Sequence, residues 1–122
     1  MNAITVNLTP AEFDEWNYAS LAAGLRVREW GLTMLDLATC DPPGVIAMSE
    51  INPAWGTVDA ASRFTIYGDS VNFQWWRETL SITRFPSEFL ISSPKAAGEA
   101  YLLECWAKVT LNRASKLALP NR

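Results

Sequence analysis

Acidic side chains and two thiols are the groups in this sequence that could do acid–base, metal or nucleophilic chemistry. Three of the acids, Glu12, Asp14 and Glu15, cluster in the stretch AEFDEW. The first turn of a capped helix favours acidic side chains because they stabilise the positive end of its dipole, so we interpret this cluster as structural. Asp69 in YGDS is likewise a residue that a tight turn prefers.

Cys40 lies between Asp36 and Asp41, and these three residues could form a metal or acid–base site. The stretch CDPPG indicates that a loop begins here, and we therefore interpret both acids as solvated loop residues. A reactive thiol needs a helix N-terminus or a basic neighbour, and the sequence gives Cys40 neither. Cys105 lies among apolar residues and is predicted to belong to the core.

The 122 residues include no histidine, which excludes Ser-His-Asp and Cys-His catalysis and the usual zinc sites. The sequence also lacks GxGxxG and GxxxxGK[ST], the motifs of dinucleotide-binding and P-loop folds. An enzyme needs a convergent set of reactive groups. We therefore predict that the protein is not an enzyme and has no catalytic residue, metal site or cofactor.

The N-terminal region is predicted to be a short strand over residues 4–8 followed by a helix over residues 10–23. Thr9 is a good N-cap, Pro10 suits the first helical position, and Glu12 completes a capping box. Beyond Gly24 the pattern allows a continued helix, a second helix, or a strand at LRVREW.

From Arg63 onward the hydrophobic period changes to two, which favours strands. RFTIY and VNFQWW flank GDS, a plausible hairpin loop, and TLSITRF and EFLIS indicate a third and a fourth strand. AYLLECWAKVTLN alternates without interruption, so we favour a strand over residues 99–112, although its composition also permits a helix.

These elements predict an α+β fold in which an N-terminal helical region packs on an antiparallel sheet of about four or five strands. We expect one domain over residues 1–122, as its length indicates. Within it we expect a helical region over about 9–37, a loop over 38–62, a β-rich region over 63–112 and a flexible tail over 113–122.

Two tryptophans stand side by side in VNFQWWRETL, residues 71–80. On a strand, Trp75 would enter the core and Trp76 would join a polar face, where an indole is a good interface anchor unless the N-terminal helix covers it. Trp106 could do the same on the last strand. Arg77 and Arg84 could clamp an anion, although ordinary surface pairs are the simpler interpretation. The interface candidates are therefore Trp76, Trp106, Trp55, Arg77 and Arg84.

The net charge is −3, which argues against direct binding to nucleic acid. Residues 1–69 carry nine acids and three bases, whereas residues 70–122 carry seven bases and four acids. This split predicts two faces of opposite charge that could meet in copies of the chain or in a larger protein partner.

The N-terminal MNAITVNLTP lacks the basic start and apolar run of a signal peptide, and no apolar run approaches the roughly 20 residues that a membrane span needs. We therefore expect no membrane contact, a location in the cytoplasm of a host cell or in a virion, and two reduced, buried thiols.

The stretch LTPAEFDEW, followed by Tyr18, resembles the opening of some small phage tail-assembly proteins. The likeness covers about ten residues, and LAAGLRVREWGL stands where that family has a Pro-Phe-Gly stretch. The resemblance implies a phage or mobile-element source.

The leading functional hypothesis is a non-enzymatic protein that works through protein–protein contact as a small phage-type virion structural or assembly component. One alternative is a small inhibitor of a host defence factor, of the anti-CRISPR or immunity type, whose acidic half mimics nucleic acid. Another is an α+β domain that binds a small ligand in a pocket between helix and sheet.

Overall fold

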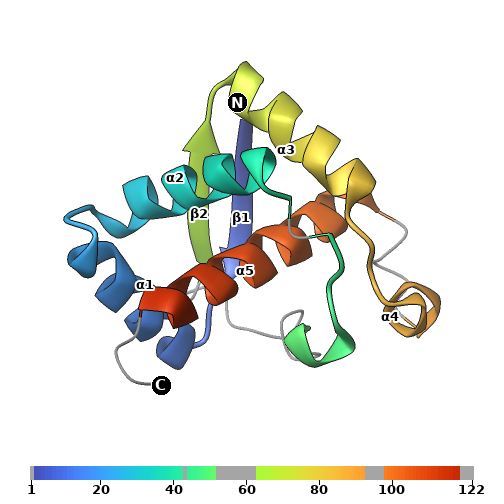
Figure 1. Cartoon of the computed structure of the whole chain (residues 1–122), viewed down its shortest axis with the longest axis horizontal. Coiled ribbons are helices and arrows are strands. Elements are labelled where there is room, and N and C mark those ends of the chain that lie inside the picture. Colours follow the sequence, from blue (N-terminus) through green and yellow to red (C-terminus); the bar gives the residue numbers. More distant parts are fainter. Residues whose placement is uncertain (1, 43, 52–62, 93–97, 119–122) are drawn as a thin grey trace.

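The computed structural model of the chain describes residues 2–42, 44–51, 63–92 and 98–118. Figure 1 shows how the elements of these ranges are arranged. In chain order they are β1 (Asn2–Asn7), α1 (Pro10–Ala22), α2 (Val27–Cys40), the 3-10 helix η1 (Met48–Glu50), β2 (Arg63–Gly68), α3 (Ser70–Ile82), α4 (Ser87–Ser92) and α5 (Glu99–Ala118). Helices therefore dominate the described part of the chain.

β1 and β2 pair antiparallel with Ile4 opposite Ile66 and form a two-stranded sheet. Ile4, Val6, Phe64 and Ile66 alternate onto one buried face, as the period of two requires. The predicted sheet of four or five strands is wrong, because every other described segment that was expected to be a strand is helical or part of a loop.

The predicted first helix is confirmed as α1, with the predicted cap. Thr9 Oγ1 accepts from the backbone N–H of Glu12 at 3.2 Å, and Glu12 Oε1 accepts from the N–H of Thr9 at 3.1 Å. Gly24 then adopts φ +72°, a left-handed conformation that ends the helix. Glycine adopts this conformation at little cost because it has no Cβ. Of the three alternatives left open beyond it, the chain forms a second helix, α2.

α3 begins where a hairpin was predicted, because GDS is a helix start. Asp69 Oδ1 accepts from the N–H of Asn72 at 2.8 Å, and Asn72 Oδ1 accepts from the N–H of Asp69 at 3.0 Å. Together these two hydrogen bonds form a capping box, which satisfies N–H groups that a helix otherwise leaves free. VNFQWW is therefore helical, and no described strand follows β2.

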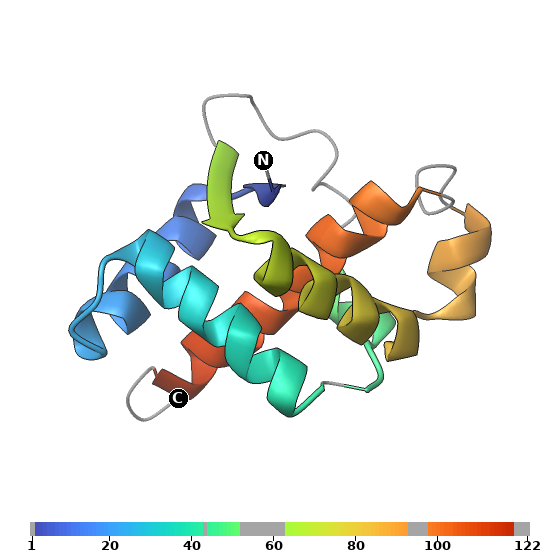
Figure 2. The same cartoon turned by 90° about the horizontal axis from the view of Figure 1, so that it is seen from above.

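α5 is the central helix and contacts α1, α2, α3 and β1. Figure 2 shows it crossing both α2 and α3. Every residue from 105 to 111 is buried, including Lys108 and Thr110. The preferred strand over residues 99–112 is wrong. A helix covered on all sides has no polar face, so its sequence does not show the 3.6-residue period that marks a surface helix.

Other regional predictions also differ from the structure. EFLIS lies in α4, not in a fourth strand, and residues 113–118 of the expected flexible tail are the last turns of α5. Within the predicted loop, Val45 forms a parallel bridge with Arg84, and Ile46 and Ile51 join Phe89 in a second hydrophobic cluster. This part of the loop is therefore packed against the helices.

Candidate protein interface

The adjacent residues Trp75 and Trp76 face different surroundings because they lie on a helix. Successive side chains on a helix diverge by roughly 100°. Trp76 is 0% exposed, whereas Trp75 is 47% exposed. The strand interpretation assigned the two rings the other way round, so Trp75 is the member of the pair that can contact another molecule.

Trp76 is held in the core by both packing and hydrogen bonding. Its ring lies edge-on to Phe73, with centroids 6.1 Å apart, and its Nε1 donates to Asp36 Oδ1 at 3.1 Å. A Cβ on Gly68 would lie 2.7 Å from the Trp76 ring, so only glycine lets the end of β2 approach this closely. Asp36, predicted to be a solvated loop residue, therefore lies in α2 and anchors α3.

The other predicted interface residues are separated in the structure. Trp106 is 0% exposed within the core cluster, and like Trp76 it cannot be an exposed anchor. Trp55 lies outside the described residues. Arg77 pairs with Glu99. Arg84 is exposed, and its backbone N–H donates to Gly44 O at 2.7 Å.

The outer face of α3 carries a row of side chains at helical spacing, Val71, Trp75, Glu78 and Ile82, which we call the α3 stripe. Its three apolar members are 49%, 47% and 61% exposed in chain order. Thr39 and Cys40 at the end of α2 border it and, with Trp75 and Ile82, line a hollow of about 480 Å³. The stripe and hollow form a continuous surface where α2 meets α3.

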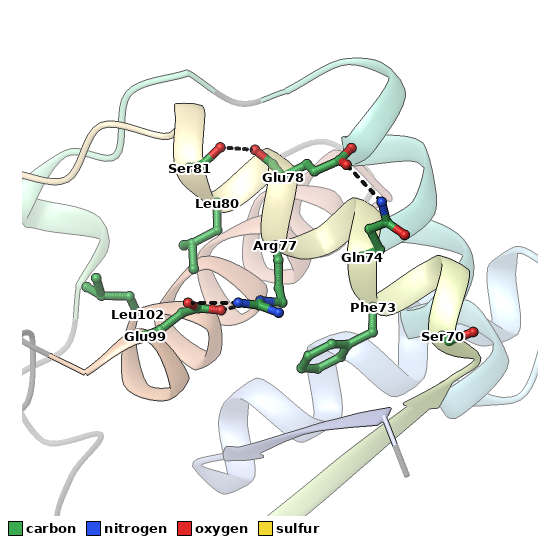
Figure 3. A pocket seen from close by; sticks show the side chains of 9 residues that line it. All are labelled: Ser70, Phe73, Gln74, Arg77, Glu78, Leu80, Ser81, Glu99 and Leu102. Atoms are coloured by element: carbon green, nitrogen blue, oxygen red, sulfur yellow. Dashed lines mark hydrogen bonds and ion pairs between the residues drawn. The ribbon is translucent and has the colours of Figure 1, made fainter.

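A larger groove of about 850 Å³ lies on the other side of α3, where it faces the start of α5. Figure 3 shows Phe73, Leu80 and Leu102 along it, with the Arg77 guanidinium pointing toward the Glu99 carboxylate. The second contact of this ion pair, Arg77 Nη2 to Glu99 Oε2, is 3.3 Å. Arg77 is therefore engaged within the chain and is not poised to clamp an external anion.

The opposite charges of the two sequence halves meet inside the fold. Lys108 Nζ donates to Glu12 Oε1 at 3.0 Å, and Arg113 Nη2 donates to Glu50 Oε1 at 2.6 Å. Both ion pairs join a base of the second half to an acid of the first. Part of the charge split that was predicted to join copies therefore stabilises the single chain.

The pKa values of these groups reflect their surroundings. Burial raises the pKa of Glu12, but hydrogen bonds from Asn112, the Thr9 backbone and Lys108 outweigh it, and the pKa lies below the usual value. Burial lowers the pKa of Lys108, against the opposing effect of Glu12. Hydrogen bonds from Arg113 lower the pKa of Glu50.

Reactive chemistry is not assembled in the part of the chain that the structure describes. No three His, Cys, Asp or Glu residues there converge to hold a metal ion. Cys105 is 2% exposed, and burial raises the pKa of its thiol to about 11. Its neighbour Tyr101 has its pKa raised by burial to about 12. Neither group is prepared to act as a nucleophile or a general base near neutral pH.

The two thiols should differ strongly in reactivity. Cys40, predicted to be buried, is exposed and open to reagents. Cys105 is buried, and its raised pKa of about 11 leaves only about a thousandth of its thiol as thiolate at pH 8. We expect one fast-reacting thiol per chain with Ellman's reagent, and a second only after unfolding in urea. Cys40→Ser should abolish the fast phase and leave the slow one. A fast phase that survives this substitution would contradict the burial of Cys105.

Sequence reasoning missed Trp75, Cys40 and Ile82 as surface residues. The signal was present, because Phe73, Trp76 and Leu80 follow the 3-and-4 spacing of a helix, and Asp69 precedes Asn72 by three residues, as in a capping box.

Comparison with known proteins adds no relative: no family model, curated protein or solved structure matches the chain. None of the helices within residues 2–42, 44–51, 63–92 and 98–118 is both long and apolar enough to cross a membrane.

Proposed function

We propose that this chain is a non-enzymatic protein that works through protein–protein contact and that the α3 stripe is its contact surface. The observation that carries the proposal is the exposure of Trp75 between Val71 and Ile82 on one helix face. An indole at the centre of an apolar row gives a large contact area and one directional N–H donor, which is why tryptophan is enriched among interface hot spots.

A second group of exposed apolar side chains lies on α1 and is the weaker candidate for the contact surface. Phe13, Tyr18 and Leu21 on α1 are 41%, 46% and 69% exposed. Phe13 already contacts Phe64 edge-on, with ring centroids 6.5 Å apart. The α3 stripe contains a tryptophan and borders a hollow that a partner side chain can enter, which makes it the better candidate.

The setting that we propose is virion structure or assembly in a phage-type system. The resemblance of LTPAEFDEW to the opening of small phage tail-assembly proteins supports this setting. Assembly by contact needs an exposed surface and no reactive centre, and the stripe provides such a surface.

The test is affinity capture with the full chain from extracts of the cells that produce it, followed by binding measurements with the isolated partner. Trp75→Asp should weaken binding by about 100-fold, as expected for a hot-spot residue, and Leu21→Asp on α1 should leave it unchanged. Circular dichroism must show that both variants are folded. Partners retained equally by both variants would place the contact elsewhere and refute the proposal.

A further inference from the structure

Residues 44–51, which we call the strap, run across α5 (Figure 1). Among them only Ile46 and Ile51 have buried side chains. Both belong to the second hydrophobic cluster, whose other buried members are Phe89, Cys105 and Val109. The strap therefore supplies two of the three described buried side chains that cover this side of α5.

The main core is built without the strap. It joins β1, β2, α1, α2, α3 and α5, and none of its described buried residues lies within residues 44–51. Two backbone hydrogen bonds align the start of the strap, from Ile46 N–H to Arg84 O at 2.9 Å and from Arg84 N–H to Gly44 O at 2.7 Å. A segment with so few buried apolar contacts opens at a lower free energy than the core on which it packs.

The ion pair between Glu50 and Arg113 ties the strap to α5. Arg113 Nη2 donates to Glu50 Oε1 at 2.6 Å and to Val45 O at 2.8 Å, while its Nε donates to the other carboxylate oxygen of Glu50. Glu50 Oε1 also accepts from the N–H of Ala47 at 2.9 Å. A single guanidinium thus holds both the start and the end of the strap, with the directional two-point contact that arginine makes with a carboxylate.

We propose that the strap opens as a unit while the main core stays folded, and that the Glu50–Arg113 pair is the latch that keeps it closed. The side chains of Arg113 and Glu50 are 34% and 26% exposed, so dissolved salt reaches the pair and weakens it. A rise in ionic strength therefore shifts the strap toward its open form and uncovers Cys105. This inference concerns another part of the molecule than the α3 stripe and is independent of the proposed function.

The first experiment follows the labelling of Cys105 by iodoacetamide in a Cys40→Ser background, with mass spectrometry of the intact chain over hours. The closed form keeps this thiol buried, so the labelling rate follows the population of open molecules. We expect Glu50→Gln and Arg113→Gln each to raise the rate about tenfold, because each removes charge-assisted hydrogen bonds from the strap. Arg77→Gln is the matched control: it breaks an ion pair of the same type between α3 and α5 and should leave the rate unchanged.

The second experiment repeats the labelling of the Cys40→Ser parent at about 0.1 M and about 1 M sodium chloride, where the screening length falls from about 10 Å to about 3 Å. Labelling should be faster at the higher concentration in the parent and should change little in Glu50→Gln, which has no latch to screen. At urea concentrations below the unfolding transition, labelling should respond to urea more weakly than global unfolding does, because opening of the strap exposes less surface.

The inference would be overturned if labelling and global unfolding by circular dichroism had the same dependence on urea, since Cys105 would then become accessible only when the whole chain unfolds. Equal acceleration by Arg77→Gln, or latch variants that label at the rate of the parent, would also refute it. If the latch variants do not fold, the salt and urea series on the parent decide the question alone.

Discussion

Replacing Trp76 with alanine should lower the free energy of unfolding by about 3–5 kcal/mol, the usual cost of truncating a buried aromatic side chain. The ring is 0% exposed and packs against Phe73. Its removal leaves a cavity between β2 and α3 and takes one hydrogen-bond donor from Asp36. The measurement is urea unfolding followed by far-ultraviolet circular dichroism, since tryptophan fluorescence would itself change with the substitution.

Trp75→Ala is the matched control, with the same change of side chain at the next position. Because Trp75 is half-exposed, we expect it to lower the free energy of unfolding by about 1 kcal/mol or less. Trp76→Phe separates the two contributions to Trp76, since it keeps most of the apolar volume and loses the hydrogen bond to Asp36. Equal losses for Trp75→Ala and Trp76→Ala would contradict the helical placement of the pair.

The start of α1 could be predicted from sequence because all of its signals agree. Thr9, Pro10 and Glu12 favour a helix and suit no common alternative. The start of α3 could not, because GDS serves two structures equally well. Asp69 after a glycine suits a tight turn between strands and also suits an N-cap, and the apolar residues that follow alternate closely enough to satisfy a period of two.

α5 could not be predicted as a helix for a different reason, which is its buried position in the fold. Residue patterns reveal a helix when one side meets water, and the middle of α5 meets α1, α2, α3 and β1 instead. The burial of Lys108 depends on its counter-ion Glu12, which lies 96 residues away in the chain. No local window of sequence contains that information.

The sequence could name residues for the candidate interface, but it could not tell which of them reach the surface. The Trp75–Trp76 pair does divide between the core and the surface, but the helical period reverses which ring is exposed. The charge split was likewise real in the sequence, yet Glu12 with Lys108 and Glu50 with Arg113 pair within one chain. Composition identifies such groups, and only the tertiary fold decides whether their partner is internal or external.

Lys108→Met should lower the free energy of unfolding by about 3–5 kcal/mol, because it leaves the Glu12 carboxylate poorly exposed to water and without its counter-ion. The side chains of Lys108 and Glu12 are only 3% and 15% exposed, so solvent cannot replace the lost contact. Glu12→Gln keeps the size of the side chain at this position of α1 and removes the charge. The double variant should lose less than the sum of the single losses, by about 1–3 kcal/mol.

The acid dependence of stability tests the same ion pair independently. The pKa of Glu12 is lower in the folded chain than in the unfolded one, so its contribution is complete above about pH 4.5 and is lost as the pH falls through the folded pKa. Lys108→Met removes an interaction that lowers this pKa and leaves the burial that raises it. The variant should therefore lose less stability than the wild type between pH 5 and about pH 3, as measured by urea unfolding. Glu50, whose pKa is lowered by Arg113, contributes acid sensitivity equally to both proteins and serves as the internal control. Identical pH profiles would mean that Asn112 and the Thr9 backbone hold the Glu12 carboxylate without help from Lys108.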